Sequence, residues 1–205
     1  MAPLLRHDTE GSLVTGHRSQ PIARGDEDAP LGDLGERLLA ASYLEGDFLL
    51  RSGRRSTFYL DKYLFSTQPD LLRDIAAGLA AKLPAHGESD LLAGPELGAV
   101  AIVAAVSLAC GKPFVIVRKG AKGYGTDKAM EGKAEPGQRV VMIEDVVTSG
   151  GAALMAVDKL REAGLTIDTL LCVVDREEGG REQIEAKGLT FDPLFTATSL
   201  GIKKT

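Results

Sequence analysis

Residue types that commonly build metal and disulfide sites are scarce in this chain. Of its 205 residues, two are cysteine and three are histidine. Cys110 and Cys172 lie in apolar segments with no second cysteine or histidine nearby, and the histidines are scattered without ligand spacing. We therefore expect two small buried side chains in a cytoplasmic protein, and neither a disulfide nor a metal centre.

The chain also lacks a long apolar run and an excess of positive charge. No run of roughly 18 apolar residues is present, so no membrane span is predicted, and the N-terminus has no apolar signal-peptide core. The formal net charge is −5, which argues against nucleic-acid binding as a bulk property. Any anion site must then be local. The length of 205 residues suits one α/β domain.

The distribution of apolar residues divides the chain into an N-terminal arm and one domain. Residues 1–30 are polar and without periodicity, which predicts a flexible arm, and the domain is expected over residues 31–205. Apolar residues have helical spacing near Leu34 and from Leu71 to Leu83. Strands are expected over residues 47–50, 57–63, 91–93, 114–117, 140–143, 167–174 and 191–196, and a buried helix over 97–110. The alternation after Asp90 predicts an α/β fold with a central parallel sheet flanked by helices, whose ligands bind beyond the carboxyl ends of the strands.

The most informative segment, residues 140–151, reads Val-Val-Met-Ile-Glu-Asp-Val-Val-Thr-Ser-Gly-Gly. It begins as a buried strand, and its turn at Thr148–Gly151 opens an amphipathic helix. Free N–H groups and the helix dipole make such a turn an anion site. Glu144 and Asp145 do not suit a plain phosphate, but they would accept hydrogen bonds from the hydroxyls of a phosphorylated sugar. The alternative is an ordinary strand and capped helix with acids on the surface.

Residues 143–151 resemble the phosphoribosyl pyrophosphate (PRPP) motif of type I phosphoribosyltransferases. The resemblance implies that fold, with a small N-terminal hood of about residues 31–65 plus C-terminal residues, over a core of about 66–190. It implies PRPP contacts from Glu144, Asp145, Val146, Val147, Thr148, Ser149, Gly150, Gly151 and Ala152. Asp145 would also be catalytic, because its charge favours positive charge at the anomeric carbon. Mg²⁺ would be bound mainly through PRPP, since the sequence shows no metal cage.

Three cations gather in a glycine-rich loop after a predicted strand. Arg118, Lys119 and Lys122 fall within five positions. Composition alone favours a solvated charged loop, yet loops this long are often functional lids. The segment is similar to the catalytic loop of orotate phosphoribosyltransferases, which implies that these three residues bind PRPP and neutralise the leaving diphosphate. Tyr124 stands where that family usually has histidine; it can donate a hydrogen bond to PRPP but carries no charge.

Two further segments carry the same resemblance. Residues 48–56 match the N-terminal signature of the orotate enzymes; Arg51 is implied to approach PRPP, and Tyr59 and Leu60 to lie along orotate. Standing alone, this segment would indicate a hairpin with an exposed basic turn. Gly94-Pro95-Glu96-Leu97-Gly98 matches the family's pyrophosphate-binding loop. Some members have a lysine in that loop and this chain has none, so we expect the loop to bind through its backbone.

Arg176 follows a predicted strand, in the segment Asp175-Arg176-Glu177-Glu178-Gly179-Gly180. In the family an arginine of this segment faces orotate, whose carboxylate and carbonyl oxygens suit a guanidinium. The position of Arg176 at the end of a strand favours it as the arginine that faces orotate. The alternatives are Arg181, or a surface ion pair between Arg176 and Glu177. Together with Thr148, Arg176 completes the predicted orotate site.

These motifs occur in the family's order between about residues 35 and 200. They imply an enzyme that converts orotate and PRPP into orotidine 5′-monophosphate and pyrophosphate, in pyrimidine biosynthesis. The family's enzymes are homodimers whose basic loop reaches the partner's active site, and the resemblance implies the same here. A phosphoribosyltransferase for another base is one alternative, although it would not be expected to share the pattern of residues 118–122. A PRPP-sensing regulator is the other, but such proteins usually append a DNA-binding module, for which the N-terminal arm is too short.

Overall fold

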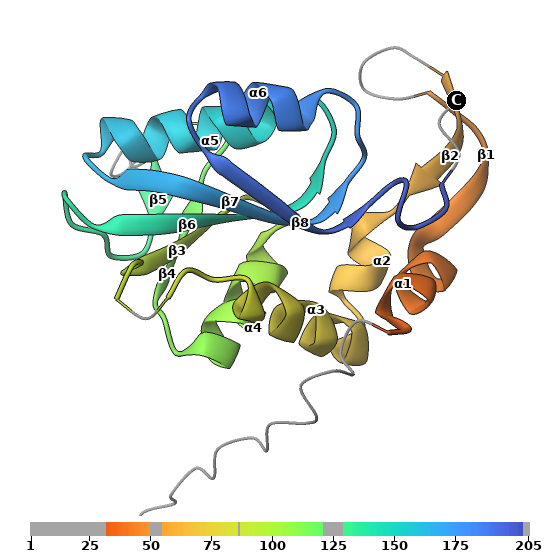
Figure 1. Ribbon diagram of the computed structural model, residues 1–205, viewed down its shortest axis with the longest axis horizontal. Helices are drawn as coiled ribbons and strands as arrows, with labels where there is room; N and C mark the ends of the chain where they lie inside the picture. Colours follow the sequence, from red (N-terminus) through yellow and green to blue (C-terminus); the bar gives the residue numbers. More distant parts are fainter. Residues whose placement is uncertain (1–31, 50–54, 86, 121–128, 203–205) are drawn as a thin grey trace, which may run out of the picture.

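The computed structural model describes residues 32–49, 55–85, 87–120 and 129–202. The predicted arm, the domain start at Leu31, and the site residues Arg51, Lys122 and Tyr124 lie outside these ranges. Within the described ranges, six strands form the main sheet and two form a small separate sheet. Figure 1 shows the main sheet between two helical layers, with the small sheet at one end of the molecule.

The main sheet has the strand order β5-β4-β3-β6-β7-β8. Its strands are β3 (Leu91–Pro95), β4 (Phe114–Val117), β5 (Met130–Glu131), β6 (Arg139–Val147), β7 (Thr166–Asp175) and β8 (Thr190–Thr196). Neighbouring strands run parallel, except that the short edge strand β5 is antiparallel to β4. The predicted central parallel sheet flanked by helices is confirmed. The order reverses between β3 and β6, and α/β sheets bind ligands at such a switch point.

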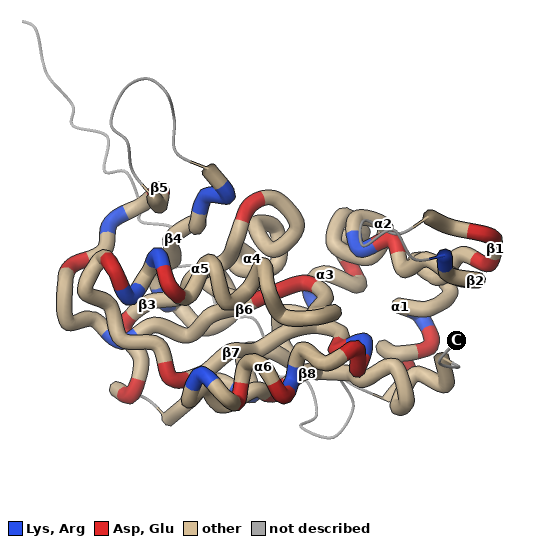
Figure 2. Tube along the Cα trace, turned by 90° about the horizontal axis from the view of Figure 1, so that it is seen from above, with Lys and Arg blue, Asp and Glu red and all other residues tan. Residues whose placement is uncertain are grey.

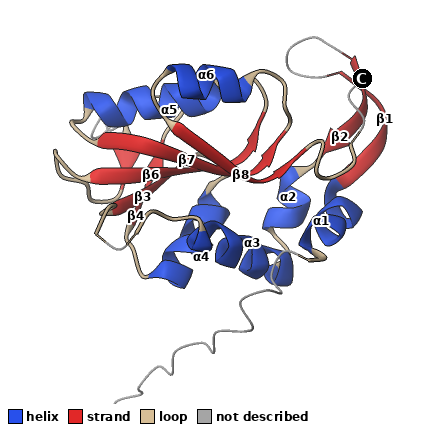
Figure 3. Cartoon of the chain, in the orientation of Figure 1, coloured by secondary structure: helices blue, strands red, loops and turns tan. Residues whose placement is uncertain are grey.

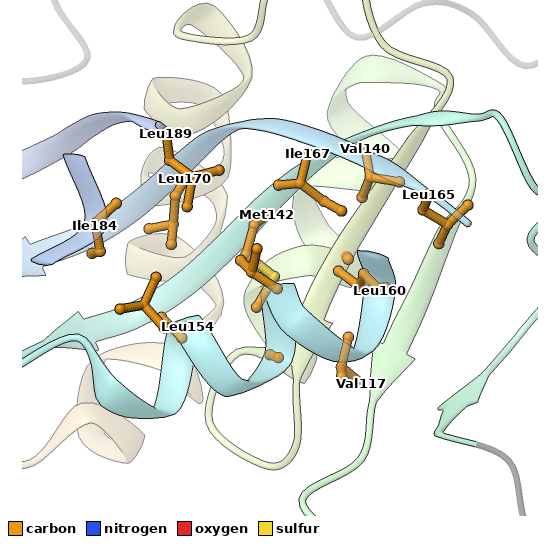
Figure 4. Packing of buried hydrophobic residues seen from close by; sticks show 14 of the residues in the cluster. Val117, Val140, Met142, Leu154, Leu160, Leu165, Ile167, Leu170, Ile184 and Leu189 are labelled. Carbon is orange, nitrogen blue, oxygen red and sulfur yellow. The ribbon is translucent and has the colours of Figure 1, made fainter. Parts of the chain in front are cut away.

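Helices cover both faces of the main sheet (Figure 3). One face carries α5 (Gly151–Glu162) and α6 (Gly180–Ala186), and the other carries α3 (Pro69–Ala81) and α4 (Val100–Cys110). Figure 4 shows the hydrophobic core between the sheet and the face that carries α5. There Leu154 and Leu160 of α5 pack with Met142 and Ile167 of the sheet. None of the helices in the described part of the chain has the length and apolar composition that crossing a membrane requires.

The small sheet pairs β1 (Tyr43–Leu49) with β2 (Arg55–Leu60) in antiparallel register. The helix α1 (Leu34–Ser42) precedes it, and α2 (Lys62–Ser66) follows it. Phe58 of β2 packs with Ala197 and Ile202 of the C-terminal segment, so residues far apart in the sequence share one small cluster. The division into a hood and a core stays a prediction. Figure 2 shows basic and acidic residues interspersed along the described chain, which agrees with a local rather than a bulk anion site.

Two element boundaries differ from the prediction. The strand expected over 57–63 ends at Leu60, because the carboxylate of Asp61 accepts a hydrogen bond from the N–H of Tyr63 at 3.0 Å and caps α2. The helix expected from Leu97 begins at Val100, after a turn over residues 96–99. In both places a local turn, and not the side-chain pattern, sets the boundary of the element.

Candidate active site

Glu144 and Asp145 lie near the carboxyl end of β6 and face opposite sides of the sheet. The prediction that both acids follow the strand is wrong, because pairing with β7 extends β6 as far as Val147, opposite Asp175. Side chains alternate along a strand. Glu144 therefore points toward the face covered by α5, and Asp145 toward the face covered by α3 and α4. Glu144 is 7% exposed and Asp145 is 1% exposed, so the sheet holds both acids away from bulk water.

Burial governs the protonation of Glu144. Removal from water, together with the nearby charge of Asp145, raises the pKa of Glu144 to about 8. Glu144 Oε1 accepts a hydrogen bond from the N–H of Asp145 at 3.0 Å, and Asp145 Oδ1 accepts one from the N–H of Val146. At neutral pH Glu144 is thus mainly protonated, and it can donate as well as accept a hydrogen bond toward a ligand.

A lysine from the small-sheet region is the charge partner of Asp145. Lys62, the first residue of α2, places Nζ 2.7 Å from Asp145 Oδ2. Within the described residues no donor is aligned with Oδ2 as a hydrogen bond requires, so the contact is an ion pair. Burial has the largest single effect and disfavours the charged ammonium, but Asp145, Glu144 and Tyr63 together outweigh it and raise the pKa of Lys62. Lys62 was not predicted as a site residue, because an ion pair between distant segments leaves no local pattern in the sequence.

The turn after β6 forms a pocket at the N-terminus of α5. The pocket has a volume of about 330 Å³ and is lined by Glu144, Val146, Val147, Thr148, Ser149, Gly150, Gly151, Ala152 and Ala153. It therefore brings together every predicted residue of the PRPP motif except Asp145, which lies on the other side of the strand. Gly150 has φ 78° at the N-cap of α5, a left-handed conformation that favours glycine. The free N–H groups of the first helical turn make this pocket suited to a phosphate.

The first residue of α6 packs closely against the same turn. A Cβ atom on Gly180 would lie 2.5 Å from the carbonyl oxygen of Thr148 and 2.5 Å from Val147 Cγ1. A glycine is therefore required for α6 to approach the turn this closely. Gly180 belongs to the segment of Arg176, but its close packing was not predicted. The adjacent pair Gly179-Gly180 was the available signal.

The loop at residues 96–99 lies against Asp145 from the opposite side of β6 to the pocket. A Cβ atom on Gly98 would stand 1.6 Å from Asp145 Oδ2 and 2.7 Å from Lys62 Nζ, so the absence of a side chain makes room for the ion pair. The Glu96–Leu97 peptide bond is cis. Glu96 Oε1 accepts a hydrogen bond from the N–H of Lys119 at 2.6 Å, which ties this loop to the start of the basic loop.

The described part of the basic loop is anchored by α5. Arg118 is half-buried, and its guanidinium pairs with Glu131 of β5 at 3.2 Å. Lys119 is exposed. From the third turn of α5, Lys159 Nζ donates hydrogen bonds to the carbonyl oxygens of Arg118 and Lys119, at 2.5 and 2.9 Å. This role of Lys159 was not predicted either, since a lysine near a helix end is common on any surface.

Arg176 lies between the end of β7 and the small sheet. Its side chain is 10% exposed, and its Nη2 is 2.9 Å from Glu178 Oε1. The alternative ion pair with Glu177 is not the one that forms, because Glu177 Oε2 accepts hydrogen bonds from Thr198. Arg181, the other alternative, has its guanidinium carbon 4.9 Å from the Phe191 ring, on the face covered by α6.

Tyr59 and Leu60 point to opposite faces of β2, as neighbours in a strand do. Tyr59 is 38% exposed, whereas Leu60 is 5% exposed and belongs to the core that includes Phe65 and Ile75. The side chain of Tyr59 is thus available to a ligand, while that of Leu60 packs inward.

Oxygen donors in the site suit a hard cation, but they do not form a cage. No group of three or more His, Cys, Asp or Glu side chains that could hold a metal ion occurs in the described ranges. Glu144 lines the pocket, and Asp145 is already paired with Lys62. This donor set fits Mg²⁺ that keeps most of its ligands from a phosphorylated substrate and water.

Known proteins are similar to this chain in sequence and in fold. The family model described as "Phosphoribosyl transferase domain" matches residues 67–191. An orotate phosphoribosyltransferase of Methanocella arvoryzae is 48% identical over 155 residues, which cover 76% of this chain and 87% of the relative. That of Halobacterium salinarum is 46% identical over 169 residues, covering 82% of this chain and 95% of the relative. Among solved structures, Mycobacterium tuberculosis orotate phosphoribosyltransferase in complex with PRPP superposes with a TM-score of 0.70 at 29% identity, over 84% of this chain and 99% of that one.

Proposed function

This chain belongs to the orotate phosphoribosyltransferases of the phosphoribosyltransferase family, and on that basis we propose that it transfers the 5-phosphoribosyl group of PRPP to orotate. The products are orotidine 5′-monophosphate and pyrophosphate, in the pyrimidine (UMP) pathway. The family and the fold predicted from the sequence are confirmed. The observation that carries the proposal is the pocket at the switch point of the sheet, where Glu144, the Thr148–Gly151 turn and the start of α5 meet.

Positioning and electrostatics are sufficient for this transfer, which needs no covalent nucleophile. The turn residues Thr148–Gly151 and the N–H groups of α5 bind the 5′-phosphate, with Val146, Val147 and Ala152 beside them. Glu144, which lines the pocket, and Asp145, on the opposite face of β6, bind the ribose hydroxyls. The charge of Asp145 then favours the positive charge that develops at the anomeric carbon as pyrophosphate leaves. The buried position of Asp145 supports this role, because a charge acts more strongly away from water.

The remaining site residues divide between the diphosphate and the base. Arg51, Arg118, Lys119, Lys122 and Tyr124 are proposed to bind PRPP, and the three loop cations neutralise the leaving group. Arg176, Thr148 and Tyr59 orient orotate, with Leu60 contributing its backbone. The half-exposed ring of Tyr59 and the buried, fixed guanidinium of Arg176 support this assignment. Mg²⁺, when bound through PRPP, supplies further neutralisation of the diphosphate.

We extend the proposal to a homodimer in which the basic loop of one subunit completes the partner's site. Exposed apolar side chains on β1, β2 and α2 support a protein-facing surface there; they are Leu44, Leu49, Tyr59, Tyr63 and Leu64. Mixing a Lys122→Ala variant with an Asp145→Asn variant tests shared sites: recovered activity supports them, and no recovery counts against them. A cytoplasmic location is part of the proposal and agrees with the free cysteines Cys110 and Cys172.

The decisive experiment follows the loss of orotate absorbance when PRPP and Mg²⁺ are added to the purified protein. Parallel reactions contain uracil, hypoxanthine or adenine. Turnover of orotate alone is expected. Turnover of another base would keep the PRPP site and refute the orotate assignment, and PRPP binding without turnover of any base would favour a sensor.

A further inference from the structure

Lys62 and Asp145 form an ion pair in which the acid has almost no contact with water. The Asp145 side chain is 2% exposed and the Lys62 side chain 32% exposed, with Nζ and Oδ2 2.7 Å apart. A carboxylate in such a place is unfavourable without a positive partner. Lys62 provides that charge from α2, an element separate in sequence and in sheet from β6.

The surroundings of the pair fix its geometry. Asp145 Oδ1 accepts the hydrogen bond of the Val146 N–H, which leaves Oδ2 for Lys62. Gly98 of the loop at residues 96–99 lies against the pair. A side chain at this position would overlap Asp145 Oδ2 and contact Lys62 Nζ. Residues 94–98 contain no lysine or arginine. The ammonium of Lys62 therefore brings a positive charge to a loop that has none.

The other ionisable groups around the pair lie on α2, β6, β7 and the loop. Glu144 is the adjacent acid, and burial raises its pKa to about 8. Tyr63 neighbours Lys62, with its ring centre 5.7 Å from Nζ. Burial raises the pKa of Cys172 well above its ordinary value, which keeps it a neutral thiol. Glu96 directs its carboxylate to the N–H of Lys119, and the first turn of α4 is wholly apolar.

We propose that Lys62 is a positioning residue of the PRPP site, whose ammonium holds the carboxylate of Asp145 in orientation for the ribose beside residues 96–99. It acts through Asp145 and not on the reacting atoms. The inference rests on the proposed function, because it assigns Asp145 to the ribose. Without Lys62, no ammonium would lie against Asp145 Oδ2, and the buried carboxylate would lose the charge partner that fixes its orientation.

The test compares Lys62→Met, which keeps the length of the side chain, with Lys62→Arg, which keeps the charge. Lys82→Met is a matched control, since Lys82 is 28% exposed and pairs with Asp192 at the same 2.7 Å, away from the pocket residues. Binding of PRPP with Mg²⁺ is measured by calorimetry at neutral pH, and kcat/KM for PRPP is measured in parallel. For Lys62→Met we expect about tenfold weaker PRPP binding and a similar fall in kcat/KM. Lys62→Arg and Lys82→Met should keep the wild-type values.

Two results would overturn the proposal. A Lys62→Met protein with a lower Tm but wild-type PRPP affinity and kcat/KM would make Lys62 a structural tie. Tighter PRPP binding in Lys62→Met would show that the ammonium competes with the ribose. Failure of the wild-type protein to turn over orotate would instead refute the proposed function, and the calorimetric comparison of PRPP binding would still decide the role of Lys62.

Discussion

The guanidinium carbon of Arg176 lies 4.7 Å from the centre of the Phe58 ring, and this contact joins the end of β7 to β2. Phe58 is itself held in place, because its ring stacks on Tyr43 with a centroid distance of 5.6 Å and an interplanar angle of 17°. A cation over an aromatic face gains roughly 0.5–2 kcal/mol, more where water is excluded. The residue proposed to face orotate is therefore oriented by an aromatic stack of the small sheet.

Replacing Phe58 with leucine should remove this support while leaving an apolar side chain in the cluster. We expect KM for orotate to rise about fivefold, within the range of a lost cation–π contact, and KM for PRPP to change little. Steady-state kinetics with each substrate varied would measure both constants. Phe58→Tyr keeps the ring and is the control. An equal rise in the two KM values would point to a general disturbance of the small sheet.

Gly180 is expected to be irreplaceable even by alanine. The added Cβ would be 2.5 Å from the carbonyl oxygen of Thr148, and backbone cannot move aside as the end of a flexible side chain can. Overpacking of this kind costs about 1–3 kcal/mol, so Tm should fall and KM for PRPP should rise as the turn shifts. Gly32→Ala is the control, since beyond its chain neighbours no atom of the described residues lies within 4 Å of the corresponding Cβ. Retention of both wild-type values would show that α6 does not shape the phosphate pocket.

Contiguous features of the site were predictable from the sequence, and contacts between distant segments were not. Residues 146–152 form the pocket because the strand, the turn and the helix start follow each other directly, so local periodicity and glycine placement identify them. Lys62 and Gly98 meet Asp145 only after β3, β6 and α2 have packed together, and one sequence carries no record of that juxtaposition. Asp61 shows a signal that was readable: an aspartate before an apolar run is a common N-cap.

Glu144 makes stability depend on pH in a defined direction. Its pKa is about 8 in the folded protein, against an ordinary value of 4.5, so the folded state binds more protons than the unfolded state between these values. Stability should therefore fall as the pH rises from about 5 to 8. Asp175 contributes in the same direction, because burial raises its pKa. In Glu144→Gln the decline in Tm between pH 5 and pH 8 should be smaller. Calorimetric scans would measure it, with the exposed Glu162→Gln as control, and an unchanged decline would contradict the assignment.

Lys159 should control turnover without touching the substrate. Its ammonium donates hydrogen bonds to the carbonyl oxygens of Arg118 and Lys119, so Lys159→Met would free the start of the basic loop from α5. Because small misplacements of charged groups lower rates strongly, kcat should fall about tenfold, while KM for orotate and Tm change little. Lys187→Met is the control, since exposed Lys187 also contacts α5, through Asp158 at 3.7 Å, but is the residue that follows α6. If kcat were unchanged, the anchor would be dispensable and the loop would be positioned by the hydrogen bond from Lys119 to Glu96.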